Sequence, residues 1–439
     1  MVSHSVTRRR ALAGGALAAG GAALAAGCGA QGAGEPAPGA AKGPVTVTYM
    51  SNLAESHPEG AARLYLLDEF NKTNEQKITV NVEEGRGATA LDKYKSLAAG
   101  GTPPDVAYAA YYHTSDMFAA GMLVDVDSEL KAEKDWARQR ADMYPAMLES
   151  STWTGKLVSL PGYTNNVAMI YNTGLLQQAG IAAPKQGWTW DDFRAALQKF
   201  SGRQGLTALS MNWSFWVHYL RTMDASPISQ DARKITVDTP ESLQVMELLL
   251  GYIKGGFTPA DGKTELYREA KNDVVFEMQG PYRIPTLRQV NAPPFAVVHT
   301  PVNPQKKVIA APNGGHNVAI FKTTPERQFA GAQVARWLNA PHAQAQMCIR
   351  ATSLPVSKAG FSSKELQDYL KTDAEMKGFV DLASYGWRWP ALPSYEKITK
   401  ALQDNVNAIL KQEVGVKDGL SRAQRDAQAF LDDDVRLMK

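Results

Sequence analysis

The N-terminal third of the chain alternates between two hydrophobic patterns. Short β-branched segments in which every second residue is apolar predict strands, and segments with apolar residues three or four apart predict helices. In chain order they are a strand at 45–49, a helix at 59–71 with Leu64, Leu67 and Phe70 on one face, a strand at 78–82, a helix through Leu91, Tyr94 and Leu97 that closes at Gly100-Gly101, and a strand at 105–108. This order predicts a parallel sheet covered by helices on both faces. Ligands bind at the carboxyl ends of such strands, which points to the loops that begin at Met50, Glu84 and Ala109.

The same patterns predict a second α/β unit over 165–305 and a helical C-terminus. Strands are expected at 156–160 and 167–171, joined by a loop at 161–166 that leads into the second unit. The further elements expected in the second unit are a helix from Trp190 behind a capping box opened by Thr189, a strand at 206–210, a helix at 240–251, and strands at 274–278 and 295–298. The elements expected after it are a strand at 317–321, helices at 326–338 and 341–349, a helix with Tyr395, Ile398, Leu402, Val406 and Ile409 on one face, and a last helix starting at Ser421.

The first 28 residues have the layout of a bacterial lipoprotein export signal. Arg8-Arg9-Arg10 precede a weakly apolar Ala/Gly/Leu segment that ends at Cys28, and residues 7–12 resemble the twin-arginine export pattern. We expect residues 1–27 to be removed, Cys28 to be acylated, and residues 28–43, rich in Gly, Ala and Pro, to form a flexible tether at the membrane surface. Ala25 stands where lipoprotein signals usually carry Leu. The alternatives are a plain secretory signal or a membrane-spanning helix, but the segment is short and glycine-rich compared with the ~20 strongly apolar residues that a span needs.

Length, charge and cysteine content narrow the function further. A chain of 439 residues is long enough for more than one core, so two lobes are expected. Residues 1–27 hold three of the 47 basic residues and none of the 44 acidic ones, so the remainder is electrically balanced. Because nucleic-acid binding needs a basic footprint, nucleic acid is excluded as a partner. Cys348 is the only other cysteine, so no disulfide is expected once Cys28 is acylated.

Motifs for catalysis or for a cofactor do not occur. The chain has no Gly-x-Ser-x-Gly, no Walker loop and no His-Glu-x-x-His, and no two of its seven histidines lie within one helical turn of each other. We therefore expect no enzyme activity, no cofactor and no metal site.

Seven short segments stand out instead. They are Gly101–Val106, Gly121–Val126, Gly155–Pro161 continuing to Ile170–Asn172, Trp188–Phe193, Gly280–Tyr282, Gly314-Gly315 and Leu354–Val356. Together they resemble, in the same order, the family 1 extracellular solute-binding proteins, the maltose-binding type that serves ABC importers. Tyr282 stands where the family has the Trp of a Gly-Pro-Trp motif.

The resemblance implies a type II periplasmic-binding-protein fold. It consists of two α/β lobes, each a mainly parallel sheet flanked by helices, with the ligand in the cleft between them. We expect lobe 1 to comprise 44–164 and 311–357, and lobe 2 to comprise 165–310 and 358–439. The chain should cross the hinge near 164–166, near 300–312 and within 357–392, and closure around the ligand would be a hinge motion.

The resemblance also implies partners and a location. The ligand would be a carbohydrate, delivered to the transmembrane subunits of an ABC permease. The protein would be a monomer on the extracytoplasmic face of the cell membrane, held there by the lipid on Cys28.

Carbohydrates present hydroxyl groups, which bind amides, carboxylates and arginine, and apolar faces, which stack on aromatic rings. Residues of these types at expected cleft positions are the candidate ligand contacts: Asn52, Glu55, Tyr111, Tyr112, Asp116, Asn165, Trp213, Trp216, Tyr282, Gly314, Gly315, His316 and, in a loop expected to be exposed, Trp387, Arg388 and Trp389. For some of these residues a structural role is the alternative to ligand contact: a turn for Asn165, interlobe packing for Tyr282 and a tight turn for Gly314-Gly315. The residues expected to pack in the cores are Trp188, Trp190 and Trp337.

Two other functions stay open. A surface glycoside hydrolase would need only two carboxylates ~5 Å or ~6.5–9.5 Å apart, and acidic residues are plentiful. A receptor of the same fold for a glycerophosphodiester, a peptide or a uronic acid would use Arg86, Arg283 or Arg388 to hold the anion.

Overall fold

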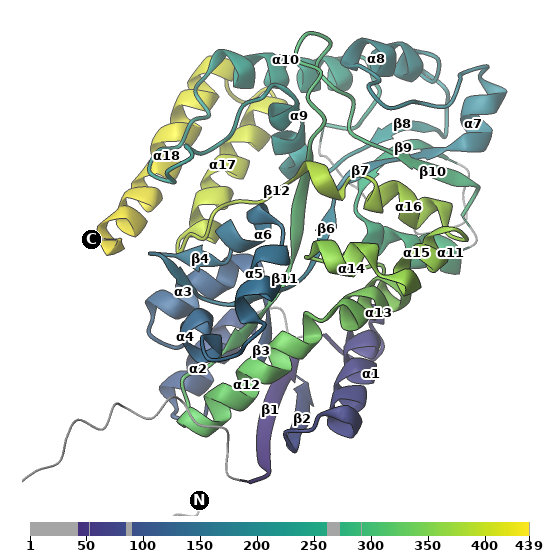
Figure 1. Cartoon of the computed structure of the whole chain (residues 1–439). Coiled ribbons are helices and arrows are strands. Elements are labelled where there is room, and N and C mark those ends of the chain that lie inside the picture. Colours follow the sequence, from purple (N-terminus) through teal and green to yellow (C-terminus); the bar gives the residue numbers. More distant parts are fainter. Residues whose placement is uncertain (1–42, 52, 85–89, 261–272, 291, 439) are drawn as a thin grey trace, which may run out of the picture. The chain divides into compact units, whose positions relative to one another are not determined.

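The structure is a computed structural model that describes residues 43–51, 53–84, 90–260, 273–290 and 292–438 (Figure 1). Cys28 and nearly all of the predicted signal and tether, together with Asn52 and Arg86, lie outside the described residues. Two helix-covered sheets give the predicted two-lobed α/β fold. None of the described helices combines the length and apolar character that crossing a membrane requires.

The first sheet has six strands in the order β12-β11-β3-β1-β2, with β6 also paired to β11. Its strands are β1 (Val45–Ser51), β2 (Ile78–Glu84), β3 (Val106–Ala110), β6 (Leu160–Asn166), β11 (Ala311–Ile320) and β12 (Gly386–Trp387). β1 pairs in parallel with β2 and with β3, as the sequence pattern predicts. The connecting helix α1 (Pro58–Thr73) buries Leu66, Leu67 and Phe70, while Leu64 is only half-buried, so its inner face is turned slightly from the predicted one.

The segment 161–166 is a strand, not the loop that the sequence predicts. As part of β6 it pairs antiparallel with β11, with Asn165 opposite Gly314 and Thr164 opposite Gly315. Burial along almost the whole strand removes the alternation that marks a strand with one solvent face. The expected strand at 156–160 is correspondingly shorter, because only β5 (Lys156–Leu157) pairs with β4 (Thr152–Trp153) in a separate hairpin.

The second sheet has the order β10-β7-β9-β8. Its first strand in the chain, β7, is separated from β6 by a single residue. Its strands are β7 (Ala168–Asn172), β8 (Thr207–Ser210), β9 (Val274–Gln279) and β10 (Phe295–Val298), close to the predicted ranges. β8 and β9 are parallel, whereas β7 is antiparallel to both β9 and β10. β11 then returns to the first sheet and starts at Ala311, six residues before the predicted start, because Pro312–His316 carry no β-branched pattern yet bond to β6.

Helices cover both sheets, and two of them begin with a Thr cap followed by Pro, at Thr239-Pro240 and Thr324-Pro325. The capping box predicted at Thr189 is formed with Asp192. The other helices are α2 (Ala90–Ala99), α3 (Thr114–Ala119), α4 (Val126–Leu130), α5 (Trp136–Asp142), α6 (Pro145–Glu149), α7 (Thr173–Gln178), α8 (Trp190–Gln198), α9 (Trp216–Thr222), α10 (Pro240–Lys254), α11 (Ile284–Gln289), α12 (Pro325–Leu338), α13 (Pro341–Ala351), α14 (Lys358–Ser362), α15 (Lys364–Leu370), α16 (Ala374–Val380), α17 (Tyr395–Leu410) and α18 (Val416–Leu437), with 3₁₀ turns η1 (Tyr111–His113), η2 (Trp213–Phe215), η3 (Pro281–Arg283) and η4 (Ala383–Tyr385).

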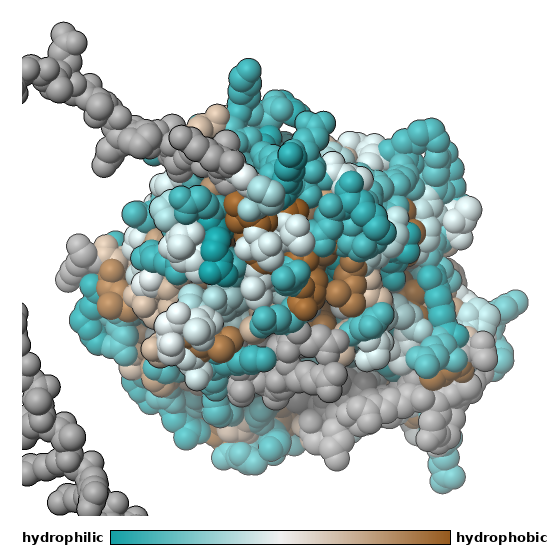
Figure 2. Space-filling view, turned by 90° about the horizontal axis from the view of Figure 1, so that it is seen from below, coloured by the Kyte–Doolittle hydropathy of each residue, from teal (hydrophilic) through white to brown (hydrophobic). Residues whose placement is uncertain are grey.

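The C-terminal helices α17 and α18 pack beside α10 in the second lobe (Figure 1). α17 buries Ile398, Leu402, Val406 and Ile409, which confirms the predicted face. α18 starts at Val416 rather than at Ser421, because Gly415 caps it one turn earlier. The predicted core tryptophans Trp188 and Trp190 pack in the second lobe, and Trp337 packs edge-on against Phe70 in the first. On the face shown in Figure 2, apolar side chains lie in small groups between polar ones, as expected when most apolar residues are in the cores.

Candidate functional site

A cavity of about 480 Å³ lies beside β6, β11 and β12, and we call it the strand chamber. It is lined by Tyr111, Tyr112, Asn165, Val167, Ser214, Phe215, Val217, His218, Tyr282, Pro312, Asn313, Gly314, Trp387, Trp389 and Tyr395. These residues include no carboxylate, lysine or arginine. Burial lowers the pKa of His218 to about 3, so its ring is uncharged at neutral pH. The strand chamber is therefore an electrically neutral, aromatic cavity.

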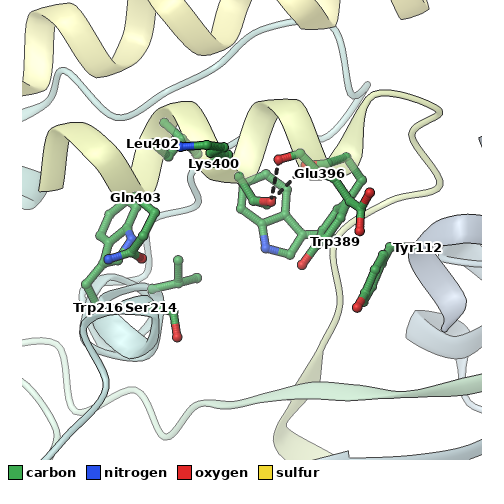
Figure 3. Close-up of a pocket in the computed structure, with 11 residues that line it drawn as sticks. Tyr112, Ser214, Trp216, Trp389, Glu396, Lys400, Leu402 and Gln403 are labelled. Atoms are coloured by element: carbon green, nitrogen blue, oxygen red, sulfur yellow. Dashed lines mark hydrogen bonds between the residues drawn. The ribbon is translucent and has the colours of Figure 1, made fainter. Parts of the chain in front are cut away.

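A second cavity of about 400 Å³ lies along α17, and we call it the helix chamber. It is lined by Tyr112, Ser214, Trp216, Val217, Trp389, Tyr395, Glu396, Thr399, Lys400, Leu402 and Gln403. Figure 3 shows Tyr112 at one side of this cavity, Trp216 and Ser214 at the other, and the polar side chains of α17 along it. Both volumes fall within the ~300–1,000 Å³ typical of small-molecule sites.

The two chambers adjoin through a common wall. Tyr112, Ser214, Val217, Trp389 and Tyr395 line both of them. The rings of Tyr112 and Tyr395 stack with centroids 4.6 Å apart and planes 17° apart, and Trp389 meets Tyr395 edge-on at 5.9 Å. The wall thus consists mainly of stacked aromatic rings contributed by η1, by the segment after β12 and by α17.

A hydrogen bond next to this wall ties η1 to α17. Nε2 of His113 lies 2.9 Å from Oε1 of Glu396. η1 directly follows the carboxyl end of β3, which is where the sheet topology predicts ligand-binding residues. The neighbouring Tyr111 is buried, and burial raises its pKa to about 12, so its hydroxyl stays protonated at neutral pH.

In the segment Trp387-Arg388-Trp389, Arg388 and Trp389 are buried and Trp387 is half-buried, which corrects the prediction of an exposed loop. It is extended as it leaves β12, so alternate side chains point to opposite sides. Trp387 and Trp389 line the strand chamber, and the Arg388 guanidinium enters the space beside β6 and β11, where the residue is 4% exposed. The two tryptophans and the arginine therefore have different surroundings.

The Arg388 guanidinium is bound by backbone oxygens. Its Nη2 donates to the carbonyl oxygens of Tyr163 at 3.0 Å and Gly314 at 2.5 Å, and the group lies 4.7 Å from the centre of the Tyr111 ring. Its Nε and Nη1 have no hydrogen-bond partner among the described residues. Burial lowers the pKa of Arg388 to about 10, which leaves it positively charged at neutral pH. A cation without a neighbouring carboxylate thus lies behind a neutral chamber.

Glycine at 315 makes room for this contact, and glycine at 314 makes room for the Asn165 side chain. A Cβ at Gly315 would lie 2.4 Å from the carbonyl oxygen of Tyr163 and 2.5 Å from Nη2 of Arg388, and the residue has φ 125°. A Cβ at Gly314 would lie 2.8 Å from Oδ1 of Asn165, which accepts a hydrogen bond from the Gly314 N–H at 3.2 Å. Asn165 thus bonds to the facing strand and also lines the strand chamber.

A buried polar cluster surrounds the side chain of Tyr163 on β6. The Glu59 carboxylate accepts hydrogen bonds from the hydroxyls of Tyr163 at 2.6 Å and Tyr108 at 3.1 Å. The Tyr163 hydroxyl is also 2.8 Å from Nδ1 of His316, whose ring stacks on Tyr108 with centroids 4.4 Å apart. Burial lowers the pKa of His316 to about 3. His316 therefore belongs to this cluster rather than to either chamber lining.

The predicted site residues fall into two groups. The residues that line a chamber are Tyr111, Tyr112, Asn165, Trp216, Tyr282, Gly314, Trp387 and Trp389. The described residues that line neither are Glu55, which is exposed, Asp116, which pairs with Lys95 at 2.7 Å, and Gly315, His316 and Arg388. Asn52 and the side chain of Trp213 lie outside the described part of the structure.

The sequence analysis missed the α17 side of the helix chamber. Glu396, Thr399, Lys400 and Gln403 follow the spacing i, i+3, i+4 and i+7, so they share one face of the helix. This polar stripe was visible beside the apolar face through Ile398 and Leu402, but a polar stripe alone is typical of any solvent-facing helix surface. Only the aromatic rings that the fold places opposite the polar stripe distinguish the stripe from an ordinary solvent-facing helix surface.

Comparisons with known proteins agree on the fold and the family. The family described as bacterial extracellular solute-binding protein matches residues 65–377. A probable ABC transporter-binding protein of Deinococcus radiodurans is 24% identical over 298 residues, an alignment that covers 61% of this chain and 67% of the relative. Among solved structures, a cyclic α-maltosyl-1,6-maltose binding protein from Arthrobacter globiformis is similar with a TM-score of 0.80 at 20% identity, covering 89% of this chain and all of the other. A binding protein from Mycobacterium tuberculosis in complex with glycerophosphocholine has a TM-score of 0.73 at 16% identity, covering 90% of this chain and all of the other.

Proposed function

This chain belongs to the bacterial extracellular solute-binding proteins, and from that premise we propose that it binds a carbohydrate in the adjoining chambers and delivers it to the membrane subunits of an ABC importer. The observation that carries the proposal is the composition of the strand chamber. It combines stacked aromatic rings with neutral hydrogen-bonding groups and has no carboxylate in its lining. The apolar faces of a sugar ring can stack on the aromatic rings, and its hydroxyl groups can bond to the neutral hydrogen-bonding groups.

Two amides supply the hydrogen-bonding groups that a sugar needs. Asn165 and Asn313 both line the strand chamber, and Oδ1 of Asn313 is buried without a partner among the described residues. An unpaired buried amide oxygen is costly, so a donor from the ligand would be favourable there. Since glycoside hydrolysis needs a pair of carboxylates, this lining supports binding rather than cleavage.

The test is binding of a sugar panel to residues 44–439. We expect a neutral sugar at 100 times its Kd to add about 2.7 kcal/mol to the free energy of unfolding. Trp389→Ala should abolish this gain, because Trp389 belongs to both chambers. Trp337→Ala, which alters a tryptophan outside both chambers, is the matched control and should keep it. Absence of any thermal shift across mono- and oligosaccharides would contradict a carbohydrate ligand.

Arg388 supports a second candidate, an anionic solute such as a glycerophosphodiester. The buried cation has two N–H groups without partners and no carboxylate neighbour among the described residues, so a nearby anion would stabilise it. The similar fold of the glycerophosphocholine-bound protein is compatible with this ligand class. Arg388→Met should weaken phosphodiester binding far more than neutral-sugar binding if the ligand is anionic. Equal losses would favour the neutral sugar.

We also propose that the lipid predicted on Cys28 holds the protein beside its permease. The export layout of the first 28 residues supports this location, and a tether raises the effective concentration of ligand-loaded protein at the membrane. The mature protein should therefore start at an acylated Cys28, which mass spectrometry of the membrane fraction would detect. A mature chain with unmodified Cys28 in the culture medium would refute the anchor and leave the binding proposal intact.

A further inference from the structure

The C-terminal end of α18 contacts the first lobe, although the rest of the helix packs in the second. α17 and α18 lie beside α10, and Met438 at the end of α18 packs against the large core of the second lobe. Met438 also packs against a small separate cluster formed by Trp153, Val158 and Ala391. Figure 1 shows this end of the helix beside β4, the strand that contains Trp153. One side chain thus joins the second-lobe core to the β4–β5 hairpin.

The small cluster continues into the first lobe. Phe118 of α3 meets Trp153 edge-on with ring centroids 6.2 Å apart. Phe118 also packs against the first-lobe cluster that includes Ala109 of β3 and Ala319 of β11. Trp153 is buried, and its Nε1 has no hydrogen-bond partner among the described residues, so packing alone holds the ring. An apolar path therefore runs between the two lobes through Phe118, Trp153 and Met438.

A buried carboxylate fixes the end of α18 that carries Met438. Both side-chain oxygens of Asp434 accept the backbone N–H of Ser394, at 3.1 and 3.0 Å, directly before α17 begins at Tyr395. Asp434 precedes Met438 by four residues, so the two side chains lie on the same face of the helix. Met438 is therefore presented to Trp153 by a firmly held helix end.

Other contacts cross the same boundary nearer to the chambers. The ring stack of Tyr112 on Tyr395 and the hydrogen bond of His113 to Glu396 both join η1 to α17. The wall shared by the two chambers exists only while η1 and α17 stay together. A hinge motion that separates the lobes would part them. The contact between Met438 and Trp153 opposes that motion, because it ties the same two parts of the protein together.

We infer that the end of α18 is a latch, in which Met438 packed against Trp153 stabilises the arrangement of the two lobes that assembles the chamber wall. The latch needs no ligand. Its effect on affinity rests on the proposed binding in the chambers. A protein that spends less time in the binding-competent arrangement has a proportionately weaker apparent affinity.

The test measures the distance between the lobes by double electron–electron resonance on residues 44–439. Spin labels are attached at Lys72→Cys on α1 and Lys199→Cys after α8, both exposed positions, while the buried Cys348 stays unlabelled. Without ligand, the labelled protein should give one main distance. Met438→Ser should raise the population of a second distance about three- to tenfold, as expected for the loss of one apolar side-chain contact.

Leu437→Ser is the matched control, because Leu437 is the neighbouring apolar residue but is 59% exposed. It should leave the distances unchanged. Trp153→Ala removes the other half of the contact, so adding Met438→Ser to it should cause no further change. Circular dichroism checks that each variant is folded.

Equal distance distributions for Met438→Ser and the unmodified protein, or an equal shift in Leu437→Ser, would overturn the latch. Once a sugar ligand is known, Met438→Ser should also weaken its binding, and an unchanged Kd would refute the effect on affinity. The distance measurement uses no sugar, so a sugar panel without any binding would refute the proposed function and not the latch.

Discussion

Replacing Gly315 by alanine adds one methyl group where β6, β11 and Arg388 meet. The new Cβ would lie 2.4 Å from the Tyr163 carbonyl oxygen and 2.5 Å from the Arg388 guanidinium, distances at which something must shift. The carbonyl belongs to β6, whose residues from Tyr163 to Asn166 pair with β11 from His316 back to Asn313, so it cannot move alone. The backbone φ of 125° is also a conformation that L side chains rarely adopt.

Both effects destabilise the folded chain. Backbone strain of this kind costs about 1–3 kcal/mol, and forcing an extra methyl into a packed position costs a further ~1–3 kcal/mol. We therefore expect Gly315→Ala to lower the free energy of unfolding by about 2–6 kcal/mol, a large part of the ~5–15 kcal/mol typical of a folded protein. Urea unfolding followed by circular dichroism and tryptophan fluorescence measures this loss.

Gly155 provides the matched control. It also has a positive φ, 77°, but a Cβ there would meet no heavy atom within 4 Å. Gly155→Ala should therefore lower the free energy of unfolding by the backbone strain alone, about 1–2 kcal/mol. Adding Arg388→Ala to Gly315→Ala removes one of the two clashes, so the double variant should lose less than the sum of the single losses. If Gly315→Ala costs no more than Gly155→Ala, the close approach at β6 and β11 does not constrain the protein.

Two further substitutions test buried and exposed charges. Glu59→Gln should cost about 3–5 kcal/mol in urea unfolding, because it removes the carboxylate that accepts both tyrosine hydroxyls beside the buried Arg63. The change Glu75→Gln at an exposed position should stay within ~0.5 kcal/mol. Burial acts to lower the pKa of His342, but hydrogen bonds and charges from Glu69 and Glu365 outweigh it and raise this pKa. Since the raised pKa belongs to the folded state, the stabilisation from protonated His342 is complete below the ordinary histidine pKa of about 6.5 and is lost as the pH rises through the folded-state pKa. His342→Gln should therefore flatten this part of the curve of unfolding free energy against pH. An unchanged curve would exclude the ion pair.

Element order was predictable because it depends on local patterns. Parallel pairing of β1 with β2 and β3 follows from strands separated by helices, and the capping box at Thr189 is written within four residues. β6 was missed because strands buried on both faces lose the alternation that identifies them, and Pro161-Gly162 suggested a turn. The early start of β11 was missed because this part of the strand also lacks an alternating pattern: Gly314 and Gly315 pair through their backbone and have no side chains to pack.

The site was only partly predictable, because its residues meet through the fold. Tyr111 and Tyr112 were found from their place after a parallel strand, and Trp387 and Trp389 from their composition. Asp116 satisfies the same positional rule but points to Lys95, and sequence position alone does not reveal which way a helical side chain faces. The α17 stripe was missed for the converse reason: its spacing was visible, but two of the rings that face it, Tyr112 and Trp216, come from η1 and α9, more than 170 residues away.

The buried charge of Arg388 restricts the charge that the ligand can carry. Burying a guanidinium without a carboxylate costs several kcal/mol, so something must compensate for it. Two backbone carbonyls and the face of Tyr111 do so in part, and Nη2 of Arg388 reaches the carbonyls where Gly315 leaves room. The residual positive charge lies behind a chamber whose own lining is neutral, so it repels cationic ligands, tolerates neutral ones and attracts anionic ones. A cationic amino sugar should therefore bind the strand chamber more weakly than its neutral parent, and Arg388→Met should reduce that difference. Equal affinities in the unmodified protein would show that the charge is fully screened from the chamber.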